Sequence, residues 1–340
     1  MIAIAIICGA SAGAVRADER ATCAVLAVAQ GDAQAGDAAE LGALLASTVR
    51  RSPKLLLVDL ADAADPSGAQ ARADKARAAA ETLALARKAY DALDVDAAFE
   101  QSRRAIYLGA EAPLSQRREA LTAALLLAGA SRYYAGDEPG ARGEFLRLFG
   151  IDPSVRLNPS DWSPEVLRVA EGERAKGAAE RRGEAKVRTE PVPAQIYVDG
   201  VYTGVSPLIL HGLAPGPHDI TAVAAGYEQR DALLSPGGEQ AMALVPANSG
   251  RDLLGLEKEL AAAFGSKEGD EALRQIGRDA GAEQVVGARL ELRGQARIAH
   301  VIRIQVSDGK RLSQVSGDVS LATPPGVTAA DALLRSALVP

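Results

Sequence analysis

Apolar residues near the start of the chain follow the pattern of a β-α-β unit. Two short apolar runs, at 22–28 and 54–60, predict strands, and between them Leu41, Leu44 and Leu45 recur at helical spacing. Two continuous apolar strands joined through a helix predict a parallel pair that is buried on both faces. We assign this unit to residues 22–66 and interpret Pro66-Ser67-Gly68 as a linker.

The next segment, 69–177, has the periodicity of amphipathic helices. The predicted helices span 71–93, 97–108, 114–134 and 139–149. Ser163 followed by Pro164 predicts the N-terminus of a further helix, because Ser caps well and Pro suits the first helical position. Charges of both signs alternate over 171–184, so we expect this helix to continue there as a solvated linker.

Beyond residue 186 the pattern changes to short strands. Residues 186–247 contain apolar runs separated by Gly and Pro, which is typical of a small β domain. Ile196 and Val198 share one face of a strand, and Asp199-Gly200 directly after them is a hairpin signal.

The last segment, 251–322, combines helices and strands. Leu253, Leu256 and Leu260 predict one amphipathic helix, and Ala272 and Ile276 predict a second. Three strands are then expected, at 284–292, 296–306 and 311–321.

Together these segments predict a multidomain α+β protein. A helical block and a small β domain are flanked by a β-α-β segment and an ααβββ segment. Neither flanking segment, 22–66 or 251–322, has enough strands to be stable alone. We therefore expect the two flanking segments to pack together as one domain, with the helices and the β module inserted between them.

The first seventeen residues resemble a secretory signal peptide. No charge precedes Arg16, and the apolar run closes on small residues with Val15-Arg16-Ala17 as the expected cleavage site. The prediction is a protein exported to the periplasm or cell envelope, with no integral membrane segment after cleavage. The alternative is that this run is a buried first strand of the N-terminal domain.

The helical segment is similar to tetratricopeptide repeats. The small, aromatic and Pro residues that carry the similarity are Gly129, Gly136, Ala141, Phe145 and Pro153. Small residues at these offsets let paired helices approach closely. Leu125 stands where the repeat has Trp, so the resemblance implies a degenerate repeat block over 69–177.

The strand-rich segment closely resembles the PEGA domain family of bacterial envelope and surface proteins. The resemblance is carried by 191–207, by Leu213-Ala214-Pro215-Gly216 and by Ala225-Gly226-Tyr227. Pro191-Val192-Pro193-Ala194 stands where the family has Pro-Glu-Gly-Ala. The resemblance implies a small β-sandwich over 186–247 and indicates almost nothing about a catalytic or ligand-binding site.

The C-terminal segment has a weaker resemblance. The sequence of 281–287 is similar to a helix-to-strand step in the amino-terminal domains of periplasmic Tol-type and curli-secretion proteins. Their β-α-β start is also similar to residues 22–60.

Composition and motifs argue against several functional classes. The net charge of −6 offers no concentrated basic face, so we expect no nucleic-acid partner. The sequence has no phosphate-binding loop, no G-x-S-x-G and no H-E-x-x-H motif. His211 and His218 lie near only one further ligand, Asp219, so hydrogen-bonded surface or edge histidines are favoured over a metal site. We expect no enzyme activity, no catalytic residue, no metal and no cofactor.

Two interaction sites are therefore the candidates. Tyr133, Tyr134 and Phe145 could line a groove of the helical repeats for envelope protein partners, although aromatic residues at this spacing also suit a repeat core. The alternative function is binding of cell-wall or surface glycan on an aromatic platform, for which Tyr197, Tyr202 and Tyr227 are the candidates in the β module. We expect a non-catalytic envelope scaffold or adaptor first, and the glycan-binding module second.

Overall fold

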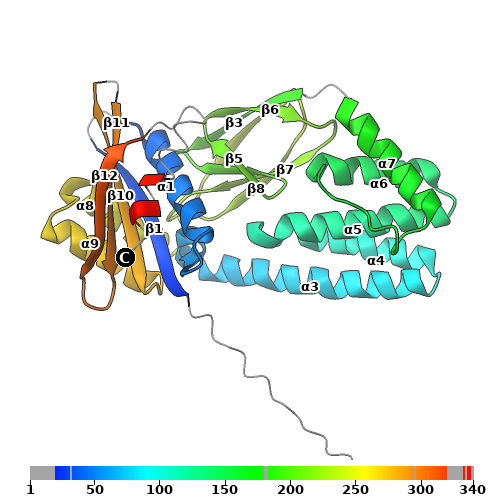
Figure 1. Cartoon of the computed structure of the whole chain (residues 1–340), viewed down its shortest axis with the longest axis horizontal. Helices are drawn as coiled ribbons and strands as arrows, with labels where there is room; N and C mark the ends of the chain where they lie inside the picture. The colour runs from blue at the N-terminus through cyan, green and yellow to red at the C-terminus, as the bar shows by residue number, and fades with distance from the viewer. Residues whose placement is uncertain are drawn as a thin grey trace, which may run out of the picture.

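The computed structural model describes residues 20–30, 33–179, 183–294, 296–319, 332–333 and 335–337. The expected signal peptide at 1–17 lies outside these described residues. The described chain is a mixed α and β protein with three units (Figure 1): a five-stranded sheet with its helices, a helical block, and a strand-rich region.

The five-stranded sheet is built from both ends of the chain. Its order is β12-β11-β10-β1-β2. The bounds of its strands are Ala21–Gln30 (β1), Leu55–Val58 (β2), Gln284–Arg293 (β10), Ala296–Gln305 (β11) and Arg311–Asp318 (β12). β1 is parallel to both neighbours and has Cys23 opposite Gln284 of β10. The N-terminal and C-terminal segments, which we expected to pack together, thus contribute strands to one sheet.

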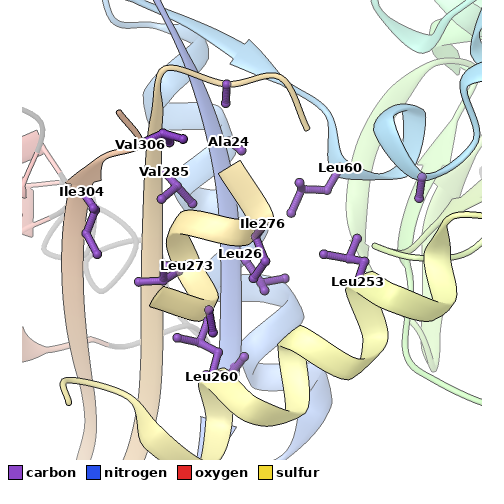
Figure 2. Packing of buried hydrophobic residues seen from close by; sticks show 14 of the residues in the cluster. Ala24, Leu26, Leu60, Leu253, Leu260, Leu273, Ile276, Val285, Ile304 and Val306 are labelled. Carbon is purple, nitrogen blue, oxygen red and sulfur yellow. The ribbon is translucent and has the colours of Figure 1, made fainter. Parts of the chain in front are cut away.

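Helices cover the two faces of this sheet. Alternate residues of β1 point to opposite faces. Cys23 packs with Leu41 and Leu45 of helix α1 (Ala35–Arg50), whereas Leu26 lies in the cluster of helices α8 (Gly250–Ala263) and α9 (Lys267–Asp279). Figure 2 shows the second cluster, in which Leu260 and Ile276 approach β1. Burial on both faces explains why the sequence of β1 is a continuous apolar run.

The helical block follows β2. Its helices are α3 (Pro66–Asp91), α4 (Val95–Ala110), α5 (Leu114–Tyr134), α6 (Glu138–Ile151) and α7 (Pro164–Ala179), and a short helix α2 (Leu60–Ala64) precedes them. The interpretation of Pro66-Ser67-Gly68 as a linker is wrong, because these residues are the first turn of α3. The side chain of Asp65 accepts a hydrogen bond from the Gly68 amide at 3.0 Å, and Pro66 occupies the first helical position.

The strand-rich region has two sheets, with orders β6-β3-β9 and β5-β4-β7-β8. The strands are β3 (Gly183–Glu190), β4 (Gln195–Val198), β5 (Val201–Val205), β6 (Leu208–Leu213), β7 (His218–Val223), β8 (Arg230–Leu234) and β9 (Glu239–Ala243). Both sheets contribute to one hydrophobic cluster, with Val187 and Leu210 from the first and Ile196 and Ile220 from the second.

Two local predictions in this region have different outcomes. The hairpin is present, since Val198 pairs with Val201 and the turn residues Asp199 and Gly200 have φ of 50° and 79°. The linker helix does not reach residue 184, because β3 begins at Gly183. In β3, exposed charged residues alternate with the buried Ala185 and Val187, which is the pattern of a strand. The mixed charges of this stretch led to its assignment as a solvated helix.

Among the described residues, no helix combines the length and the apolar character needed to cross a membrane.

Candidate interaction site

Phe145 is a core residue and does not line a groove. Its side chain is fully buried in the helical block. It packs directly on Gly129, where a Cβ atom would lie 2.6 Å from the ring carbon Cε1 of Phe145. The expectation that Phe145 faces a partner is therefore wrong, because the absence of a side chain at Gly129 admits the ring into the interior.

Tyr133 and Tyr134 lie in a cluster of aromatic side chains that no sequence pattern indicated. The ring of Tyr134 is 5.7 Å from that of Tyr133 and 6.0 Å from that of Tyr90, measured between centroids. Tyr90 in turn lies 5.7 Å from Trp162. These separations are those of favourable edge-to-face or tilted aromatic pairs.

A guanidinium group completes this cluster. The Cζ atom of Arg87 lies 5.3 Å from the ring centroid of Trp162 and 5.7 Å from that of Tyr90. We name Arg87, Tyr90, Tyr133, Tyr134 and Trp162 the aromatic patch. Tyr134 is 46% exposed, and Tyr90 and Trp162 are half-buried, so the patch is partly open to solvent. Burial, and after it the neighbouring Tyr134, raises the pKa of Tyr90 to about 12, so this hydroxyl stays protonated at neutral pH.

Helix ends bring the patch together. α3 and α5 both end at the face of the block that is remote from the five-stranded sheet (Figure 1). α5 ends at Tyr134, Ala135 is its C-cap, and Gly136 follows with φ of 84°; the loop before α7 supplies Trp162. The sequence signal for this arrangement was weak, because the three loops that follow or contain these aromatic residues are far apart in the chain. The reversed direction of α4 puts the ends of α3 and α5 together, and the loop 152–163, which starts beside Arg118 at the opposite end of the block, brings Trp162 back to them.

The three tyrosines of the strand-rich region do not form an exposed platform. Tyr197 and Tyr227 are each 6% exposed, and only Tyr202, at 37%, reaches the surface. The ring of Tyr202 packs edge-on against Tyr197 with centroids 5.7 Å apart. Tyr227 belongs to the core shared by the two sheets. The glycan platform expected from these residues is therefore contradicted by their burial.

Tyr197 instead lies where the three units meet. It packs with Val223 of the same region, with Ala61 of α2 and with Leu114 at the start of α5. A second contact nearby is the fully buried Arg117 of α5. Its guanidinium donates to Thr221 at 2.6 Å, to Asp231 at 2.9 Å and to the carbonyl of Ala112. These contacts fix the strand-rich region against the helical block.

The histidines are hydrogen-bonded. His211 is exposed and contacts Glu184 at 2.8 Å, and His300 contacts Ser316 and Glu291. His218 is buried, contrary to the surface or edge position expected for it. Its Nδ1 lies 2.6 Å from a carboxylate oxygen of Asp199 and its Nε2 lies 2.9 Å from the Ala214 carbonyl.

The charge state of His218 follows from these two contacts. Burial alone would lower the pKa of His218, but the hydrogen bonds to Asp199 and Ala214 outweigh it and raise the pKa. Both partners are acceptors, which suits an imidazolium that donates from both nitrogens. Within the described ranges, no group of three or more His, Cys, Asp or Glu side chains is placed to hold a metal ion.

A cavity of about 450 Å³ is lined by β1, α1, α8 and the strand-rich region. Val25, Ala27, Ala38, Val223 and Leu254 are among its lining residues. The lining comes from two distant parts of the chain, 25–61 and 192–261, so no local sequence pattern indicated the cavity.

Comparison with protein families finds a match to the PEGA domain at residues 182–241. Comparisons with curated proteins and with solved structures find no match. The match covers strands β3 to β9 except for the end of β9, and it begins before residue 186, where we had expected the module to start. The strand-rich region between the helical block and α8 thus contains a PEGA domain.

Proposed function

We propose that this chain is a non-catalytic scaffold of the bacterial cell envelope that binds a protein partner through the aromatic patch. The observation that carries the proposal is the gathering of Tyr90, Tyr133, Tyr134 and Trp162 in one place, in a chain with only 4% aromatic residues. Tyr, Trp and Arg are enriched at the energetic centres of protein interfaces. Arg87, which contacts two of these rings, supplies the third residue type.

We also propose that helices α3 to α6 are degenerate tetratricopeptide-like repeats and that the PEGA domain is a β-sandwich. The close approach of Gly129 to Phe145 supports the first assignment, since small residues serve this role in such repeats. The core shared by the two sheets supports the second. In this scheme the PEGA domain holds the helical block at a fixed position relative to the five-stranded sheet, through Arg117 and Tyr197.

The envelope location is part of the proposal. The apolar run at 1–17, with small residues at the expected cleavage site, supports export, and the PEGA resemblance is to envelope and surface proteins. Fractionation of the tagged protein should recover it in the periplasmic or envelope fraction. Recovery in the cytoplasm alone would contradict this part.

Photo-crosslinking tests the partner site. A benzophenone amino acid replaces Tyr134 in one variant and Tyr107 in a matched control; Tyr107 is 65% exposed on α4 and outside the patch. We expect a discrete adduct from position 134 in cells and none from position 107.

The charge of the patch gives a second readout. Combining the probe at position 134 with Arg87→Glu should abolish the adduct, because it removes the cation that stacks on the Trp162 ring. Adducts of equal yield from both probe positions, or an adduct that persists with Arg87→Glu, would refute the aromatic patch as the partner site.

A further inference from the structure

One edge of β1 has no neighbouring strand over half of its length. β10 pairs with β1 from Cys23 to Gln30, whereas β2 on the other side pairs only from Ala21 to Ala24. We name the β2 side of residues 25–29 the open edge. Within the described part of the chain, β10 is the only strand that lies beside Ala27 and Ala29.

The cavity of about 450 Å³ lies along this open edge, since all five residues from Val25 to Ala29 line it. Its volume is within the range of about 300–1,000 Å³ that is usual for ligand pockets. One wall is α1, where the lining residues are Ala35, Ala38, Ala39, Gly42, Ala46 and Arg50. The small side chains of this wall leave room beside β1.

Backbone polar groups point into the cavity. Along a strand, successive backbone groups face opposite neighbours. The amide of Ala21 donates to Lys54 on the β2 side, and the carbonyl of Thr22 accepts from Glu283 on the β10 side. By this alternation, the N–H and C=O groups of Ala27 and Ala29 face the open edge. An occupant with its own backbone donors and acceptors can satisfy these groups, and an apolar small molecule cannot.

A carboxylate at the cavity indicates the charge of the occupant. Glu257 of α8 lines the cavity, and no residue described in the structure forms a hydrogen bond or ion pair with it. Of the other charged lining residues, Asp59 caps α2 through the Ala61 amide and Arg50 contacts Tyr197. Lys258 also lines the cavity and lowers the pKa of the Glu257 carboxyl, against the effect of burial, but forms no ion pair with it. A basic side chain on the occupant can form the direct ion pair that Glu257 does not make with Lys258.

We propose that the open edge binds an extended segment of a partner protein, which adds to the sheet as a strand beside β1. The segment has apolar side chains facing α1 and α8, and a Lys or Arg that reaches Glu257. Main-chain hydrogen bonds to Ala27 and Ala29 supply affinity, and the walls select small or β-branched side chains, as is general for strand addition. This site is separate from the aromatic patch and does not depend on it.

Binding of peptides to the full chain tests the proposal. The probes are end-blocked, fluorescein-labelled heptapeptides in which valine alternates with alanine or with lysine, and the same peptides N-methylated at alternate amides along either edge. N-methylation removes backbone donors and leaves the side chains in place. We expect saturable binding of at least one unmethylated peptide, at least tenfold weaker binding of its methylated forms, and slower hydrogen exchange at Ala27 and Ala29 in the complex.

Matched glycine variants locate the site. Gly42 lines the cavity, and its added Cβ would contact Ala27 at an ordinary 3.5 Å, so Gly42→Leu should fill the space and weaken binding at least tenfold. Gly255→Leu, on the open surface of α8 and outside the lining, should leave binding unchanged. Gly42→Ala serves as the milder variant if Gly42→Leu does not fold, and it should weaken binding by a smaller factor. Glu257→Gln should weaken only the lysine peptides.

Three results would overturn the proposal. Equal binding of the methylated and unmethylated peptides would mean that the cavity is an apolar pocket and not a strand site. Unchanged binding to a folded Gly42→Leu or Gly42→Ala variant would place the peptide elsewhere. Failure of every unmethylated peptide to bind the folded chain would remove the site. The variant Tyr134→Ala should bind these peptides normally, so failure here is distinguishable from failure of the proposed function.

Discussion

Arg117 Nη1 lies 2.9 Å from Oδ1 of Asp231, and this ion pair joins the helical block to the PEGA domain. The guanidinium is 1% exposed, and the same nitrogen also donates to Thr221. Its remaining donors reach the carbonyl of Ala112, which lies just before α5. This buried guanidinium makes four hydrogen bonds and is costly to disturb, because each acceptor loses its bond together with Arg117.

Replacing Arg117 should weaken the junction strongly. We expect Arg117→Met to lower the free energy of unfolding by about 2 kcal/mol, because the Ala112 carbonyl loses both side-chain donors, whereas Asp231 is 49% exposed and keeps its bond from Thr221. The neighbouring Arg118 is the control: it pairs with Asp152 at 2.7 Å but is 38% exposed, so Arg118→Met should cost about 1 kcal/mol or less. Urea unfolding followed by circular dichroism measures both. Equal losses for the two variants would argue against a special role of Arg117.

Gly129 and Phe145 give a prediction for the core of the helical block. In Gly129→Ala the new methyl group would lie 2.6 Å from the Phe145 ring, so we expect a loss of about 2 kcal/mol from overpacking. Gly143→Ala on α6 meets no atom within 4 Å and should stabilise by about 0.5–1 kcal/mol through helix propensity alone. If Phe145→Leu relieves the clash, the double variant should lose less than the sum of the single variants. Strict additivity would contradict the contact.

His218 should make the PEGA domain pH-dependent. Its pKa is raised in the folded state, so its contribution to stability is complete below the ordinary histidine pKa of about 6.5 and declines as pH rises through the folded pKa. We expect the urea midpoint of the wild type to decrease as the pH rises above about 6.5, a range above the ordinary titration of carboxyl groups.

Two variants test this assignment. Asp199→Asn removes the carboxylate that contacts Nδ1, and it should flatten the pH dependence. His211→Gln is the control on an exposed histidine and should leave the dependence as in the wild type. The same slope in Asp199→Asn and the wild type would assign the dependence to another group.

Cys23 reports on the pairing of the two chain ends. Burial raises the pKa of its thiol to about 12, so the thiol is protected in the folded protein. In a Cys8→Ser variant, where Cys23 is the sole cysteine, we expect no reaction with a thiol reagent at pH 8 until the protein is unfolded in urea. Deleting residues 250–340 removes β10, the strand opposite Cys23, and should make the thiol reactive without denaturant. A thiol that stays protected in the shortened chain would show that Cys23 is buried without the strands and helices of residues 250–340.

Local sequence determined the elements of this protein, and tertiary structure decided how they combine. The helix at Leu114–Tyr134, the hairpin at Asp199-Gly200 and the PEGA resemblance all depend on residues that are near one another in the chain, where periodicity and turn chemistry act directly. Local patterns were misread where two signals competed, as at Asp65-Pro66, where a capping residue precedes a turn-like sequence.

The candidate sites could be predicted only in part. Tyr133 and Tyr134 were identified, but Phe145, Tyr197 and Tyr227 were assigned to surfaces although they are buried, because periodicity shows that a residue faces one side and not what covers that side. The partners of Tyr134 and the cavity beside Ala27 were not foreseen at all. The apolar run of β1 indicated burial on both faces, and the small number of strands in each flanking segment indicated that the two pack together. The choice of β10 as the strand beside β1 depends on contacts across the whole insertion, which no local pattern encodes. The residue pattern within one segment determines whether it forms a helix or a strand. Contacts between distant segments determine which side chains meet, and both candidate sites are built from such contacts.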